Sequence, residues 1–351
     1  MENLENIATN YLESNSVNWR MGVELNNKLA LQNPALAFAC LKRSIELKPT
    51  LVKRFNLKSP ELIQVANTHQ TIALDDCVSV GTYFKVPTIN SKEIIDLEIF
   101  SILSNEISRC PTLKKIRKQE KIFGFGSCFA INFVNYLNKV GLDAYSTIIS
   151  EDINCPINNL LLLKWIFQNE ESRLILDLKQ LNPDIERLTL LKRFKESDHI
   201  FLTLGSSFYL INNQEKPEIT LKPTKNTRYS LQTISSAKES IKELVKLIHL
   251  FNNKVNIFIT VSPIPLRGVL DARNPVAANI ASKAVLRAAI EELIIEQELS
   301  FTYLPIYDAI IGLCPYLSMP AFGTDDGESR HLNGFIINSM MKQVSQLIVE
   351  E

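Results

Sequence analysis

The stretch KIFGFGSCFAINFVNYLNKVG, residues 121–141, contains the side chains best suited to nucleophilic chemistry. A short apolar run ends in Gly-Phe-Gly, and Ser127 and Cys128 then open an amphipathic helix. A serine in this position is lifted above the edge of a sheet, where the positive end of the helix favours a developing oxyanion. Gly126 permits the sharp turn that a side chain would obstruct. The pattern therefore predicts Ser127 as a nucleophile for acyl transfer, with the Cys128 thiol as its rival.

Two nucleotide-binding motifs fit these glycines poorly. A dinucleotide fingerprint needs Gly-x-Gly-x-x-Gly, but position 129 is Phe, and no acidic residue ends the second predicted strand. A phosphate-binding P-loop needs a Gly-Lys-Ser/Thr sequence, which this stretch lacks. The glycines are better explained by the turn that presents the serine.

A hydroxyl nucleophile needs a general base, and the chain has histidines only at positions 69, 199, 249 and 331. His331 is the best placed, because it lies in the polar loop FGTDDGESRHLNG (322–334), just before the last predicted helix. Glu328 can turn back onto the Nδ1–H of His331 and fix the tautomer, while Asp325 and Asp326 are alternative carboxylates. The competing explanation is a solvated acidic loop that contains an incidental histidine.

Regular elements must bring these side chains to one edge. Strand-length apolar runs recur at 121–125, 142–148, 198–204, 255–261 and 299–304, and helix-like stretches follow at 128–139, 157–168, 235–251, 276–297 and 333–349. This alternation predicts a parallel sheet with helices on both faces, and a ligand crevice beyond the carboxyl ends of the strands. The segment 169–197 is expected to be an insertion or a cover.

The N-terminal residues 1–50 predict a helical arm. Residues 33–49 resemble the second helix of a tetratricopeptide unit, but a solenoid needs about three such units. Packing on the main domain is therefore the simpler role, and docking of a protein partner through these helices is the alternative.

A connecting segment, residues 51–120, is expected to pack on the main domain, residues 121–351. It is predicted to contain a strand at 78–87 and a helix at 91–107.

The composition excludes several classes of function. Lys plus Arg and Asp plus Glu each number 38, so no general attraction to nucleic acid is expected. No apolar run approaches the roughly 20 residues that span a bilayer, and the first residues do not resemble a signal peptide. The six cysteines form no Cys-x-x-Cys pair. We therefore expect a reduced, cytoplasmic protein without a metal site or cofactor.

The sequence GSCFA (126–130) is the signature that names the GSCFA-domain proteins, which are similar to the SGNH (GDSL-like) hydrolases. The chain resembles this family over about residues 120–340, including the stretches LTLGSSFYL (202–210), TVSPIPLRG (260–268) and NIASKAVLRAAIEEL (279–293). The resemblance implies a three-layer α/β/α domain with a flavodoxin-like five-stranded parallel sheet. It also implies that Ser127 is the nucleophile, His331 the base, and the Ser127 N–H and Gly205 parts of an oxyanion hole.

Several positions depart from the SGNH pattern. Ser207 stands where those enzymes have an asparagine that donates to the oxyanion, and the loss of one such donor typically costs about 3 kcal/mol. Asn154 or Asn158 is the candidate donor in place of a second-block glycine, and Glu328 replaces an aspartate. Arg267 follows the fourth predicted strand and could hold a carboxylate, a phosphate or a sugar hydroxyl. Ser282 and Lys283 are expected mainly to serve packing and capping, and a ligand role is the alternative.

The resemblance implies a serine-dependent acyl-ester hydrolase or O-acyltransferase, commonly an acetyltransferase, acting on a glycan or another carbohydrate ester. Its cytoplasmic location would suit surface-polysaccharide biosynthesis. The alternative is a non-catalytic binding or scaffold protein with a degenerate SGNH-like fold, which the missing asparagine and the helical arm would explain.

Overall fold

The computed structural model describes residues 4–14, 18–30, 32–48, 51, 92–107, 113–148, 153–212, 218–268, 274–317, 319–323 and 329–350. The chain divides into two compact units, Met1–Lys85 and Val86–Glu351. The predicted strand at 78–87 and the carboxylates Asp325, Asp326 and Glu328 lie outside the described residues.

The N-terminal unit contains the helices α1 (Leu4–Glu13), α2 (Trp19–Leu29) and α3 (Pro34–Leu47), which confirm the predicted helical arm. Its core is made by apolar side chains from all three helices, among them Ala8, Leu25 and Cys40. Gly22 of α2 lies directly against α3, since a Cβ there would overlap the Ser44 hydroxyl and the Cys40 carbonyl. The arm therefore has a hydrophobic core of its own.

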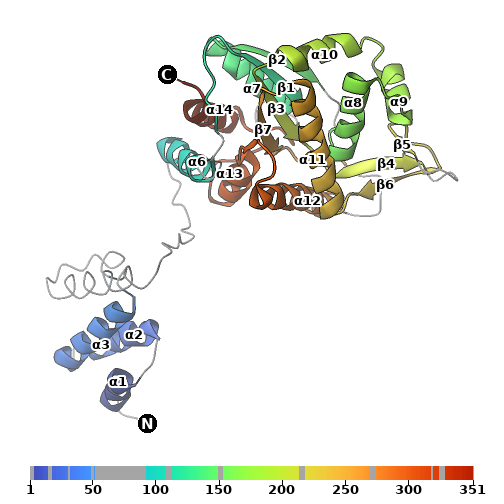
Figure 1. Ribbon diagram of the computed structural model, residues 1–351. Helices are drawn as coiled ribbons and strands as arrows, with labels where there is room; N and C mark the ends of the chain where they lie inside the picture. Colours follow the sequence, from blue (N-terminus) through green and yellow to red (C-terminus); the bar gives the residue numbers. More distant parts are fainter. Residues whose placement is uncertain are drawn as a thin grey trace. The chain divides into compact units, whose positions relative to one another are not determined.

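The second unit is built on a parallel sheet (Figure 1). Its strands are β1 (Lys121–Gly126), β2 (Asp143–Ile148), β3 (His199–Leu204), β7 (Asn256–Val261) and β8 (Thr302–Tyr303). They lie in the order β2-β1-β3-β7-β8, and every paired neighbour is parallel. This is the strand order of a flavodoxin-like doubly wound fold, which confirms the predicted fold class.

Helices cover both faces of this sheet. They are α6 (Lys92–Ile107), α7 (Cys128–Lys139), α8 (Pro156–Gln168), α11 (Ile234–Phe251), α12 (Pro275–Glu296), α13 (Ile306–Leu313) and α14 (Gly334–Ile348). A short 3-10 helix, Cys314–Tyr316, follows α13.

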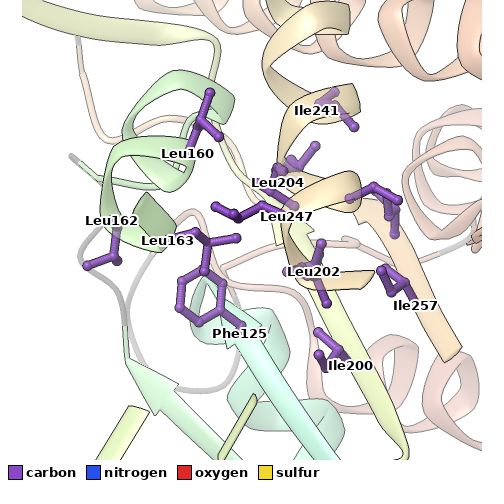
Figure 2. Close-up of a cluster of buried hydrophobic side chains, with 14 of the residues drawn as sticks. Phe125, Leu160, Leu162, Leu163, Ile200, Leu202, Leu204, Ile241, Leu247 and Ile257 are labelled. Carbon is purple, nitrogen blue, oxygen red and sulfur yellow. The ribbon is translucent and has the colours of Figure 1, made fainter. Parts of the chain in front are cut away.

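Alternate residues of each strand divide the interior into two cores. On one face, Phe125 of β1 and Leu202 of β3 pack with side chains of α8 and α11, such as Leu163 (Figure 2). On the other face, Ile122 and Phe201 pack with α6, α7, α13 and α14. Because the strands are buried on both sides, their sequences are continuous apolar runs.

The helix α6 belongs to the predicted connecting segment, and it packs within the second unit. Its Ile95, Ile99 and Leu103 are buried in the same core as α13 and α14. Asp96 accepts hydrogen bonds from Ser339 and, at 2.9 Å, from Lys342 of α14. This packing agrees with the predicted helix at 91–107, while the predicted domain boundaries stay predictions.

A second, antiparallel sheet follows β3, and the sequence pattern did not predict it. Its strands are β4 (Phe208–Asn212), β5 (Ile219–Thr220) and β6 (Thr227–Leu231), in the order β5-β4-β6. The predicted insertion contains α9 (Arg173–Leu181) and α10 (Arg187–Glu196). Figure 1 shows the small sheet beside α9, and the buried Asp177 of α9 accepts hydrogen bonds from Thr220 Oγ1 (2.5 Å) and Leu221 N (3.1 Å).

Candidate functional site

Ser127 occupies the turn between β1 and α7. It follows Gly126, whose φ of 137° is a conformation that L side chains rarely adopt, so a glycine is required there. Ser127 caps α7, and its Oγ accepts a hydrogen bond from Phe129 N at 3.3 Å. The serine oxygen thus lies at the positive end of a twelve-residue helix.

Thr203 holds this serine from the neighbouring strand. Its Oγ1 accepts the Ser127 N–H at 2.7 Å and lies 3.0 Å from Ser127 Oγ. The contact is tight, because a Cβ on Gly126 would overlap Thr203 Oγ1 and the Thr203 carbonyl. Thr203 was not predicted from the sequence, although a lone hydroxyl near the carboxyl end of the apolar strand HIFLTL was the available signal.

The serine lies at the switch point of the sheet. The strand β1 has β2 on one side and β3 on the other. The chain leaves β1 through α7, which packs in one core, and enters β3 from α10, which packs in the opposite core. Connections that diverge in this way leave a crevice at the carboxyl ends of the two strands, where ligands bind in open α/β sheets.

Asn154 bridges this edge. It follows β2, yet its carbonyl accepts hydrogen bonds from Gly205 N (3.1 Å) and Ser206 N (2.9 Å), both of which follow β3. Its side chain is fully buried, and Oδ1 accepts a hydrogen bond from Asn159 Nδ2 at 3.3 Å. The Nδ2 group of Asn154 has no acceptor among the described residues. A predicted oxyanion donor, the Gly205 N–H, is therefore already paired.

The next residues of the turn are held by α12. Ser207 is fully buried, its N–H donates to Ser282 Oγ at 2.8 Å, and its hydroxyl donates to the Ser282 carbonyl at 3.0 Å. Lys283, also fully buried, donates to the carbonyls of Gly205 (2.5 Å) and Ser262 (2.8 Å). These two α12 residues thus fix the segments that follow β3 and β7.

The other predicted binding residues lie at the same edge. Asn158 is buried in the first turn of α8, four residues after Asn154. Arg267 is exposed in the connection between β7 and α12. Whether these side chains contact a ligand stays a prediction.

His331 belongs to a segment that is tied to the β7 connection. Arg330 Nη1 donates to the Pro265 carbonyl at 2.9 Å, and the His331 carbonyl accepts the Gly323 N–H at 2.8 Å. Because β7 is two strand positions from β1, and neighbouring strands lie about 4.8 Å apart, a span of about 10 Å separates the two strand ends. The pairing of Ser127 with His331 stays a prediction, as does the choice of carboxylate.

The remaining described histidines lie elsewhere. His199 is the first residue of β3, so it lies at the amino-terminal end of the strands, opposite the end that holds Ser127. Its Nε2 lies 2.7 Å from Glu120 Oε2. His249 lies on α11, and burial lowers its pKa. Cys128 begins α7, but its side chain is outside the described part of the chain.

The described residues contain no group of three or more His, Cys, Asp or Glu side chains arranged to hold a metal ion. Among the helices whose residues are described, none is both long and apolar enough to cross a membrane.

Comparison with curated proteins finds no match. Among solved structures, a carbohydrate esterase family 2 enzyme with a carbohydrate-binding domain, from Corynascus thermopiles (Myceliophthora fergusii), is similar at 14% identity and a TM-score of 0.37, with 67% of each chain covered. The model of the GSCFA family matches residues 121–319, which is more than half of the 351-residue chain and runs from β1 past α13. The chain therefore belongs to the GSCFA family.

Proposed function

We propose that this protein is a serine-dependent acyl-ester hydrolase or O-acyltransferase, with Ser127 as its nucleophile. The observation that supports the proposal is the position of the Ser127 hydroxyl, which lies at the switch point of the sheet and at the N-terminus of α7. A hydroxyl placed there meets a ligand in the crevice, and the helix end stabilises the negative charge that forms on attack. The carbohydrate nature of the ester rests on the sequence resemblance alone.

The proposed reaction has two steps. His331 takes the proton of Ser127 as the Oγ attacks the ester carbonyl, and the alkoxide leaves as an alcohol after receiving that proton from His331. Water or a sugar hydroxyl then attacks the acyl-serine, and His331 again transfers the proton. Glu328, Asp325 or Asp326 would orient the imidazole. Hydrolysis and transfer differ only in which hydroxyl enters the crevice.

Covalent labelling tests the nucleophile. A fluorophosphonate reacts with an activated serine, forming an O–P bond and releasing fluoride. Intact-mass spectrometry should show one adduct on the wild-type chain and none on Ser127→Ala. Cys128→Ala should label like the wild type, which would exclude the thiol.

The acceptor is then identified by incubating the protein with an acetylated sugar, with and without a second sugar, and measuring free acetate and transferred acetyl.

A binding or scaffold protein is the second candidate, and a specific observation favours it. Each of three predicted oxyanion donors already has an acceptor: Thr203 Oγ1 for the Ser127 N–H, the Asn154 carbonyl for the Gly205 N–H, and the Ser282 carbonyl for the Ser207 hydroxyl. If the wild-type chain and Ser127→Ala are equally unreactive toward the fluorophosphonate, the enzyme proposal is wrong and this second function is the better one.

A further inference from the structure

We infer that the side-chain amide of Asn154 is the donor that binds the acyl oxygen in this site. The inference rests on the proposed function, since it assigns a further catalytic residue to the same reaction. It starts from the buried Nδ2 group, which lacks an acceptor among the described residues. A buried amide donor left without a partner is costly, and such groups in folded proteins call for a ligand, a water molecule or a functional reason.

The amide is held in one orientation by its surroundings. Asn159 Nδ2, one turn into α8, donates to Asn154 Oδ1 at 3.3 Å, so the carbonyl side of the amide is occupied. The main chain of Asn154 is fixed separately, because its carbonyl accepts the N–H groups of Gly205 and Ser206. The Nδ2 group is thereby fixed before any ligand binds, and a donor that needs no reorganisation is effective at stabilising an oxyanion.

Gly205 leaves room for this donor. A Cβ on Gly205 would lie 2.8 Å from Asn154 Nδ2, which is closer than real Cβ contacts allow. The amide therefore lies directly against the backbone that follows β3. Thr203, which binds Ser127, is two residues earlier, near the end of β3, so its Cα is at most about 7 Å from that of Gly205.

The crossing of the chain brings the amide to the nucleophile. Asn154 comes from the connection after β2, but it binds the turn after β3, and β1 lies between those two strands. Asn154 thus lies at the carboxyl end of β3, the strand that pairs with β1 and whose Thr203 binds Ser127. An ester in this crevice would meet the serine hydroxyl and the Asn154 amide together. The amide thus supplies the donor that the three paired groups do not.

The variants Asn154→Asp and Asn154→Ala test this assignment. Both keep the main-chain carbonyl that binds Gly205 and Ser206, and Asp also keeps the shape of the side chain. The second-order rate constant of fluorophosphonate labelling at Ser127 should fall by about 10²–10³ in each variant at neutral pH, which is the usual effect of removing one oxyanion donor. Asn226→Asp, the same change in an exposed turn, is the matched control and should label like the wild type.

The pH dependence separates donation from a structural role. A carboxyl group can donate a hydrogen bond only while it is protonated. The labelling rate of Asn154→Asp, divided by that of the wild type at the same pH, should therefore rise as the pH falls from 8 to about 5. The same ratio for Asn154→Ala should stay constant. Circular dichroism and thermal unfolding establish that each variant is folded.

A third variant covers the case in which changes at position 154 prevent folding. Asn159→Ala leaves Asn154 intact but removes the hydrogen bond that orients its amide, so it should lower the labelling rate as well, by a smaller factor. If the wild type is labelled at Ser127 and the folded variants react at the same rate, the role of Asn154 is wrong while the proposed function stands. If the wild type itself is not labelled, both are wrong.

Discussion

Thr203 is the residue on which the placement of Ser127 depends most directly. Its hydroxyl oxygen is the acceptor for the Ser127 N–H and also contacts Ser127 Oγ, whereas the contact of Ser127 Oγ with Phe129 N is local. Thr203 is almost fully buried, so solvent cannot replace a lost partner.

Thr203→Val should therefore destabilise the protein. Valine matches threonine in shape but cannot accept the Ser127 N–H, and an unsatisfied donor of this kind costs about 1–3 kcal/mol. The free energy of unfolding, measured by urea denaturation, should fall by about 1–2 kcal/mol. Thr203→Ser, which keeps the hydroxyl, should lose less. Equal stability of the valine variant and the wild type would contradict this account of the contact.

At this scale the sequence allows part of the site to be predicted. Ser127 was recognisable because a small polar residue after an apolar run and a glycine has a local signature. The partners of Ser127, Gly205 and Ser207 were not, because each belongs to a segment about 50 to 80 residues away. A sequence identifies a donor more readily than it shows whether that donor is already occupied.

The turn from β1 into α7 is the element that presents the serine. Gly126 combines two constraints, a φ of 137° and a backbone in contact with Thr203. Gly141, at the start of the connection into β2, has a φ of 87°, and a Cβ added there would meet nothing within 4 Å. Comparing alanine at the two glycines therefore separates backbone strain from steric overlap.

Gly141→Ala should lower the free energy of unfolding by about 1–2 kcal/mol, which is the cost of a left-handed conformation for an L residue. Gly126→Ala should lower it by clearly more, since overpacking adds about 1–3 kcal/mol to the backbone strain. Denaturant unfolding monitored by circular dichroism measures both. Similar losses for the two variants would show that contact with Thr203 is unimportant.

Strands and helices were predictable from the sequence where the strands are buried on both faces of the sheet. The five parallel strands and the helices between them are close to the predicted ranges, because strands covered on both faces are uniformly apolar. The small sheet was missed for the opposite reason. Its strands β4 and β6, FYLIN and TRYSL, are only partly buried and mix apolar with polar residues, so they resemble loop. Their pairing depends on long-range contacts such as Asp177 with Thr220.

The stability of the molecule in acid should depend on the amino-terminal end of the strands, opposite the end that holds Ser127. There His199 Nε2 lies 2.7 Å from Glu120 Oε2, and Nδ1 lies 3.3 Å from Asn256 Nδ2. Burial lowers the pKa of His199 from its ordinary value of 6.5, although the Glu120 carboxylate opposes this shift. Burial would raise the pKa of Glu120, but hydrogen bonds from His199 and the Arg117 N–H outweigh it and lower that pKa from 4.5.

The sign of the effect follows from proton uptake. Below pH 6.5 the unfolded chain binds a proton at His199 that the folded chain resists, so the free energy of unfolding should decline as the pH falls from 7 to 5. Glu120 should extend the decline below pH 4.5. His199→Gln should flatten the upper part of the curve. His249→Gln is the comparison, because burial lowers the pKa of His249 too and it contributes its own slope. An unchanged curve in His199→Gln would contradict the prediction.

The edge of the sheet around Ser127 is assembled from connections rather than from strands. Asn154, Gly205, Pro265 and His331 each come from a different crossing of the chain, and the two apolar cores lie behind them. Protein engineers could therefore graft a foreign loop at one of these crossings and leave the hydrophobic scaffold untouched. If the proposed function holds, a library of grafted loops would be a practical route to catalysts with altered preferences.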